Sequence, residues 1–203
     1  MTAAAATWSE RAYADPVPYL RHRAELVVAL GPRLEPGDTL CDLACGDGGL
    51  ADFLPGIDYL GVDADPKMVA EARTRGRELV HADLNEFQPA APVAATSIFR
   101  AIYYARDRRA FLTRVAGYTE KKLVFDLNPR QYRVGDVRSD LLAAGFDRLA
   151  LRPFFVPQTV ALPPLAARAL LAAERVGPLA RLALRFRFTY LCAAFRGGVA
   201  DQP

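Results

Sequence analysis

The sequence has few of the residues that cross-link small proteins or bind metals. Cysteine occurs only at Cys41, Cys45 and Cys192, with no C-x-x-C pair, and histidine only at His22 and His81. An odd number of cysteines without such a pair argues against a disulfide framework and against a zinc site. We therefore expect a reducing, cytoplasmic setting and no metal.

Long apolar runs are also absent. No segment reaches the ~18 uncharged apolar residues that a membrane span requires, and the opening residues MTAAAATWSERA lack the pattern of a secretory signal. Lysine is scarce, because three of the 26 basic residues are Lys and 23 are Arg, spread along the chain. That spread is typical of a solvated surface, so we do not expect nucleic acid as a partner.

What remains is an ordinary globular balance, with 52% hydrophobic and 24% charged residues in 203. This balance argues against disorder and fits one domain with a full core. Apolar stretches predict strands at 39–43, 59–62, 78–80, 93–99, 123–127, 148–155 and 187–195. Between them, helices are expected at 16–31, near 49–54, from 66, and at 107–115 and 136–144. Such alternation predicts an α/β fold, with a parallel sheet covered by helices on both faces.

The strongest motif follows the first predicted strand and reads LCDLACGDGG over residues 40–49. Gly46 and Gly48 lack a Cβ, so they allow a sharp turn and a close approach to a ligand. The helix start behind them offers free N–H groups to an anionic group. Asp42 under this loop would repel a pyrophosphate, whereas it suits a cationic ammonium or sulfonium group.

Two further acids follow the next two strands. Asp63 ends the second strand, where a carboxylate accepts hydrogen bonds from ribose hydroxyls in nucleotide-binding α/β folds. Asp83 follows the third strand, where it is placed to accept a proton from an adenine amine while Leu84 packs on the ring. Ligands of such sheets bind outside the carboxyl ends of the strands, so these acids are expected to share one site.

Over roughly residues 38–155, this series resembles the class I S-adenosylmethionine (SAM)-dependent methyltransferases. Asp42 matches the leading acid of their glycine-rich loop, and Gly46 and Gly48 match two of its glycines. Ala44 stands where the first glycine usually is, a mild departure, because alanine fits there if its φ is negative. The resemblance implies a Rossmann-like, doubly wound sheet of seven mostly parallel strands with the last one antiparallel.

The resemblance also implies where the cofactor SAM lies, and that S-adenosylhomocysteine (SAH) is its product. The methionine part would lie near residues 42–48, the ribose on Asp63 and the adenine near Asp83, while residues 99–104 border the methyl group and the substrate. The implied cofactor-binding residues are Asp42, Ala44, Cys45, Gly46, Gly48, Asp63, Ala64, Asp83, Leu84, Phe99 and Arg100.

Two alternative functions stay open. The spacing Gly46-x-Gly48-x-x-Ala51 also fits the loose dinucleotide fingerprint, which would indicate an NAD(P)-dependent oxidoreductase. Asp42 and Asp83 argue against that alternative, because a pyrophosphate-binding strand normally ends in an apolar residue and because the second acid has no role there. The other alternative is a SAM-binding protein without turnover, since the sequence reveals no catalytic base.

For the acceptor, the sequence favours a small, rather apolar metabolite methylated on oxygen or nitrogen. Candidates for its pocket are Tyr13, Tyr19, His22, Tyr103 and Tyr104, since a tyrosine offers a hydroxyl and a ring face. Packing in the core is the competing explanation for these aromatic residues. Because His22 lies between two arginines, a solvated helix face is the competing explanation for it.

We expect a single methyltransferase domain over 1–203. It would comprise an N-terminal helical segment (1–36), the SAM-binding core (37–155), a helical insertion (156–186) and the last strand with a tail (187–203). The insertion contains amphipathic stretches at 165–175 and 179–184. A lid over the substrate pocket, a dimer contact and a peripheral contact with a membrane or lipid all remain open for it, so the protein is expected to be a monomer or a homodimer.

Overall fold

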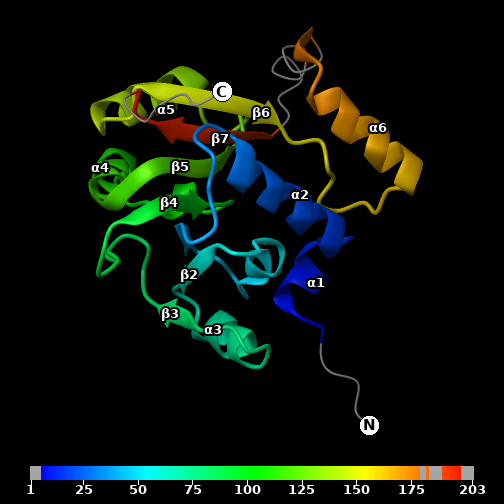
Figure 1. Ribbon diagram of the computed structural model, residues 1–203, viewed down its shortest axis with the longest axis horizontal. Coiled ribbons are helices and arrows are strands. Elements are labelled where there is room, and N and C mark those ends of the chain that lie inside the picture. The colour runs from blue at the N-terminus through cyan, green and yellow to red at the C-terminus, as the bar shows by residue number, and fades with distance from the viewer. Residues whose placement is uncertain (1–5, 179–181, 183–188, 198–203) are drawn as a thin grey trace.

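A computed structural model of the protein describes residues 6–178, 182 and 189–197. Its sheet is built from β1 (Thr39–Leu43), β2 (Asp58–Asp63), β3 (Leu79–His81), β4 (Val93–Ile98), β5 (Thr119–Leu127), β6 (Arg148–Pro153) and β7 (Tyr190–Phe195). The spatial order is β3-β2-β1-β4-β5-β7-β6 (Figure 1). The first five strands pair in parallel, while β7 runs antiparallel to both β5 and β6. The mostly parallel sheet with an antiparallel last strand is confirmed.

The helices are α1 (Trp8–Ala12), α2 (Pro16–Ala29), η1 (Gly49–Phe53), α3 (Pro66–Arg73), η2 (Ile102–Tyr104), α4 (Arg108–Tyr118), α5 (Val134–Ala143) and α6 (Pro164–Glu174). Every helix predicted above is present, and α1 and η2 are additional. Asp65 starts α3 as its cap and accepts the N–H of Lys67 at 2.9 Å. Asp15 occupies the same position before α2, but its side chain makes no capping hydrogen bond.

Alternating side chains of the central strands fill a core on each face of the sheet. On β5, Leu123 and Phe125 belong to the core under α4 and α5. Val124 between them belongs to the opposite core, which α2 and η1 cover. Helices therefore lie on both faces, as the alternation of elements predicts. They leave the carboxyl ends of the parallel strands uncovered.

Two further helices, α1 and α6, are each held by a hydrogen bond or ion pair to another helix. α1 begins with a capping box of Thr7 and Glu10, and the backbone N–H of Trp8 donates to Glu71 on α3. α6 lies beside α2 in Figure 1, and its last residue, Glu174, is paired with His22 on α2 at 2.6 Å.

Part of the predicted insertion lies outside the described residues. Of the amphipathic stretch expected at 179–184, only position 182 is among the described residues. The first two residues of the strand expected at 187–195 also lie outside them. Over residues 6–178, 182 and 189–197, no helix combines the length and the apolar character that crossing a membrane requires.

Candidate active site

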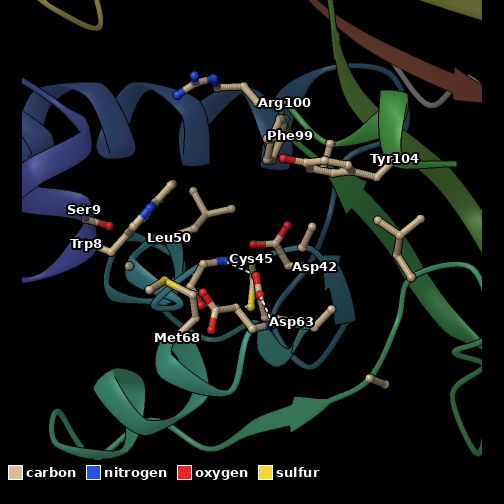
Figure 2. Close-up of a pocket in the computed structure, with 18 of the residues that line it drawn as sticks. Trp8, Ser9, Asp42, Cys45, Leu50, Asp63, Met68, Phe99, Arg100 and Tyr104 are labelled. Carbon is tan, nitrogen blue, oxygen red and sulfur yellow. Dashed lines mark hydrogen bonds between the residues drawn. The ribbon is translucent and has the colours of Figure 1, made fainter.

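A cavity of about 740 Å³ opens at the carboxyl ends of β1, β2, β3 and β4. A cavity of this size can enclose a small organic ligand. Asp42, Asp63 and Asp83 all line it, and so does Phe99, which follows the end of β4. Figure 2 shows Asp42, Asp63 and Phe99 around this cavity. The structure therefore brings together the three acids that follow successive strands in the sequence.

The loop after β1 adopts left-handed backbone conformations at three positions. Ala44 has φ 55°, so the condition of a negative φ, under which alanine fits without strain, is not met. Gly46 has φ 63°, and a Cβ on it would lie 2.9 Å from the ring of Trp8. Gly48 has φ 69° and faces Leu79 instead of the cavity, so it shapes the turn before η1 and does not touch the cavity.

Asp42 lies almost fully buried at the floor of the cavity, with 3% of its surface exposed. Its two carboxylate oxygens accept the hydroxyl protons of Ser97 and Tyr59, each at 2.6 Å. Burial raises the pKa of Asp42 to about 6, although these two hydroxyls act to lower it. The site therefore holds a desolvated carboxylate, which a cationic ligand group would stabilise.

Asp63 at the end of β2 is held by backbone groups. One oxygen accepts the N–H of Gly46 at 2.7 Å, and the other accepts the N–H of Asp65 at 2.9 Å. Burial raises the pKa of Asp63, and these N–H groups act against the rise. Because each carboxylate oxygen can accept a second hydrogen bond, both remain able to accept a hydroxyl from a ligand.

Asp83 begins the loop after β3 and is oriented by its neighbours. One oxygen accepts the backbone and side-chain N–H groups of Asn85 at 2.8 Å, and the other pairs with Arg106 at 2.7 Å. The Asn85 hydrogen bonds hold the pKa of Asp83 below its usual value. Leu84 is buried beside it and lines the same cavity. The remaining predicted cofactor residues that line the cavity are Ala44, Cys45, Gly46, Ala64, Phe99 and Arg100.

Several lining residues come from the N-terminal segment and were not predicted from the sequence. Trp8 packs over Gly46, and the Ser9 hydroxyl donates to Asp47 at 2.6 Å. The capping box Thr7-x-x-Glu10 is the one local signal that indicates a helix at this position. Nothing in the local sequence shows that this helix covers the loop after β1.

Arg23 is buried in the wall of this cavity, with 4% of its surface exposed, so a solvated position on α2 is wrong for it. It donates to the Tyr19 hydroxyl at 2.6 Å, and its guanidinium carbon lies 4.4 Å from the centroid of the Phe99 ring. Its Nε has no hydrogen-bond partner, and no carboxylate in the described part of the chain forms an ion pair with it. A buried guanidinium of this kind is suited to an anionic ligand group.

A second cavity of about 500 Å³ lies next to the first, and Arg100 and Tyr103 line both. Five aromatic side chains line it, together with one carboxylate, that of Asp126, and several uncharged polar groups. The aromatic residues are Tyr19, Tyr103, Tyr132, Phe154 and Phe155. The shared residues make the boundary between the cavities the place where two bound molecules would meet.

The predicted substrate-pocket residues divide between these cavities. Tyr13 and Tyr104 line the first, Tyr19 the second, and Tyr103 both. His22 lies outside both, because its ring stacks on Phe154 at 5.3 Å and its Nε2 is bonded to the buried Glu174. The prediction that His22 lines the substrate pocket is therefore wrong. His22 attaches α6 to α2 instead.

Comparisons with known proteins agree with this architecture. Residues 41–122 match the model of a protein family described as "Methyltransferase domain". That segment contains Asp42, Asp63 and Asp83 together with the strands β2, β3 and β4. No curated protein matches the chain.

Three solved structures illustrate the similarity of fold. A chain from the complex between the Haloferax volcanii Trm112 methyltransferase activator and the putative methyltransferase is 19% identical, with 96% of each chain covered and a TM-score of 0.67. Magnesium protoporphyrin IX methyltransferase (ChlM) from Synechocystis PCC 6803 is 16% identical, with 95% of this chain and 86% of that chain covered and a TM-score of 0.60. A SAM-dependent methyltransferase from Clostridium acetobutylicum ATCC 824 is 14% identical, with 93% and 95% covered and a TM-score of 0.62.

The sheet has the α/β architecture in which ligands bind at the carboxyl ends of parallel strands, and its first cavity opens at those ends. Together with the match of residues 41–122 to the methyltransferase domain family, these features support a class I SAM-dependent methyltransferase, with SAM as its methyl donor. The match favours this class over the alternatives of a nicotinamide-dependent oxidoreductase and of a SAM-binding protein without turnover.

Proposed function

We propose that SAM binds in the first cavity, with its ribose hydroxyls on Asp63 and its adenine amine at Asp83 beside Leu84. The observation that carries this proposal is the position of Asp42, Asp63 and Asp83, which follow or end three successive strands and line one cavity. When bound, SAM supplies a methyl group on a cationic sulfur. Asp42 is a desolvated carboxylate at the floor of the cavity, which suits a cationic ligand there.

Arg23 is the residue that we expect to bind the carboxylate of the methionine part. SAM carries one carboxylate, and Arg23 is the buried guanidinium in this cavity that lacks a carboxylate partner among the described residues. Pairing the two would offset the cost of burying Arg23 without an anion. Trp8 and Ser9 on α1 then cover the same end of the ligand.

For the second cavity, we propose that it receives the methyl acceptor, a small and rather apolar metabolite with a reactive oxygen or nitrogen. Its aromatic lining supports an apolar molecule, and its contact with the first cavity at Tyr103 and Arg100 supports direct transfer between two bound ligands. Methyl transfer from a sulfonium chiefly requires in-line positioning of the acceptor, which a cavity adjoining the donor site can provide.

Calorimetric titration of SAM, SAH, NAD and NADP tests the proposed cofactor site. We expect the two adenosyl compounds to bind with micromolar affinity, roughly −8 kcal/mol, and the two dinucleotides not to bind. Asp63→Ala removes the acceptors for the ribose and should weaken SAM binding by about 1–3 kcal/mol. Asp42→Asn should weaken it as well, because the cationic end of SAM loses its carboxylate.

Asp58→Ala is a matched control, because Asp58 is exposed at the other end of the same strand. This variant should bind SAM like the parent protein. Unchanged SAM affinity in both Asp63→Ala and Asp42→Asn would show that the cofactor lies elsewhere.

A further inference from the structure

Asp126 is the one carboxylate among the described residues that line the second cavity. It lies near the carboxyl end of β5, and one of its oxygens accepts the backbone N–H of Arg100 at 2.6 Å. Arg100 has φ 54°, a conformation that L residues rarely adopt. Strained backbone of this kind is concentrated at functional sites. Here the strained residue holds the Asp126 carboxylate through its N–H group, at the boundary of the two cavities.

The carboxylate of Asp126 keeps accepting capacity for a ligand. In the part of the chain that the structure describes, no Lys or Arg side chain forms a hydrogen bond or an ion pair with it. A carboxylate has about four acceptor positions, and the Arg100 N–H uses one of them. Burial raises the pKa of Asp126 more than the nearby charges of Arg23 and Arg100 lower it, which favours its use as a proton acceptor near neutral pH.

In the described part of the chain, neither of the two cations near Asp126 bonds to its carboxylate through a side chain. Arg23 donates to the Tyr19 hydroxyl and lines the first cavity. Arg100 is exposed and lines both cavities, and among the described residues its guanidinium forms no hydrogen bond or ion pair with Asp126. The second cavity therefore presents a carboxylate without a bonded cation, surrounded by aromatic rings, uncharged polar groups and the exposed Arg100. Aromatic ring faces attract cations, and ammonium groups in particular.

We propose that the methyl acceptor is a primary or secondary amine on an apolar or aromatic body, and that Asp126 binds its ammonium group and takes up its proton. The proposal rests on the proposed function, because it assumes that the second cavity receives the acceptor. Asn128, Gln131 and Gln158 line the same cavity and offer uncharged hydrogen-bonding groups for the rest of the molecule.

The proposed step balances without a further reactant. The bound ammonium gives one proton to Asp126, and the freed lone pair on nitrogen attacks the sulfonium methyl group. The C–N bond forms as the S–C bond breaks, and the bonding pair remains on sulfur as SAH. Asp126 then passes its proton to water, and the product amine carries one more methyl group.

Binding of a charge series to the full chain saturated with SAH tests this proposal. The probes are 2-phenylethylamine, 2-phenylethanol and 3-phenylpropanoate, which share an aromatic body and differ in the terminal group. Affinity is measured by ligand-observed NMR and by thermal shift, and methyl transfer to each probe is measured separately with labelled SAM. We expect the amine to bind most tightly and to be the probe that is methylated.

Asp126→Asn keeps the size of the side chain and an oxygen for the Arg100 N–H, and should weaken amine binding at least about tenfold. Asp136→Asn is the matched control, because Asp136 is exposed on α5 and lines neither cavity. Tighter binding of the alcohol or the carboxylate, failure of the amine to bind, or equal amine affinity in Asp126→Asn would overturn the proposal. The series on the parent protein decides the question even if Asp126→Asn does not fold.

The same samples distinguish the two proposals. If SAH does not bind to the parent protein, the proposed cofactor site fails. If SAH binds but the amine is not preferred, only the assignment of an amine acceptor to Asp126 fails.

Discussion

At the scale of single residues, Ala44 stands where the loop that it resembles usually has glycine, and its backbone is left-handed. A left-handed φ brings the Cβ of an L residue close to the following carbonyl oxygen, at a cost of roughly 1–2 kcal/mol. The residue lies between β1 and Cys45 and lines the first cavity. The strain is therefore stored beside the proposed cofactor.

Ala44→Gly should relieve this strain. Glycine adopts the observed φ of 55° freely, but the unfolded chain gains conformational freedom, so we expect a net rise of about 1 kcal/mol or less in the free energy of unfolding. Urea unfolding measures this difference. Ala70→Gly, at an exposed helical position of α3, should instead lower stability by about 1 kcal/mol. A less stable Ala44→Gly variant would show that the alanine methyl group contributes more by packing than it costs by strain.

Single residues also mark the limit of what the sequence predicts about the site. Asp42, Asp63 and Asp83 can be found from sequence, because their position after successive strands determines where they lie. Arg23 and Asp126 cannot be found in this way. Arg23 becomes a cavity residue only because α2 packs over Phe99, and the significance of Asp126 depends on the aromatic side chains that surround it in the folded chain.

At the scale of elements, α6 is held by its last residue. Glu174 is 2% exposed, accepts the backbone N–H of Phe155 at 2.6 Å and is paired with His22 at 2.6 Å. Phe155 also lines the second cavity. The attachment of α6 is thus continuous with the wall of the proposed acceptor site, which supports a lid as the role of the insertion.

Removal of this attachment should free α6. Glu174→Ala removes the carboxylate that pairs with His22 on α2, at a cost of about 1–3 kcal/mol for a buried group left unsatisfied. We expect faster tryptic cleavage after Arg168 and Arg175, both exposed on or next to α6. SAM affinity should change little, because Glu174 does not line the first cavity.

Glu25→Ala is the control for this prediction. Glu25 is the other carboxylate near His22, at 3.6 Å, but its side chain is 63% exposed, and such surface pairs contribute little. Its cleavage rate should match that of the parent protein. Equal cleavage in Glu174→Ala would mean that α6 is held by its apolar contacts alone.

At the scale of the whole molecule, the sequence predicts the strands and helices themselves better than it predicts how distant segments pack together. The apolar strands and the capped helices follow from local patterns, so the number of strands and the antiparallel last strand are confirmed. The position of α1 over the loop after β1 is a matter of long-range packing, since it depends on Trp8, Ser9 and Glu71 finding partners far away in sequence. Patterns within one segment carry no information on such partners.

A buried lysine connects α2 to the sheet and makes stability depend on pH. The Nζ of Lys122 on β5 donates to the carbonyl oxygens of Val28 and Leu30, at 3.0 and 2.9 Å. Burial lowers the pKa of Lys122 to about 7 from 10.5. Between these values the unfolded chain binds more protons than the native state, so a rise in pH from 7 toward 10 stabilises the fold through this group.

Lys122→Met should remove that contribution. We expect the stability of the parent protein to rise relative to the variant by at most about 1.4 kcal/mol per pH unit between pH 7 and 10. Thermal unfolding at a series of pH values measures the difference. Lys67→Met, at an exposed position of α3, should follow the parent protein throughout. Parallel curves for the parent protein and Lys122→Met would show that Lys122 stays protonated in the native state.

The order of the sheet has a consequence for how the protein is made. β7 comes later in the chain than the other six strands, yet it lies between β5 and β6. Before residues 190–195 have been translated, β5 is paired only with β4 and β6 has no strand beside it, so the edges that β7 will cover are open to other chains. The nascent protein must therefore wait for residues 190–195 before its sheet can close, and until then it is the kind of partly folded species that chaperones protect.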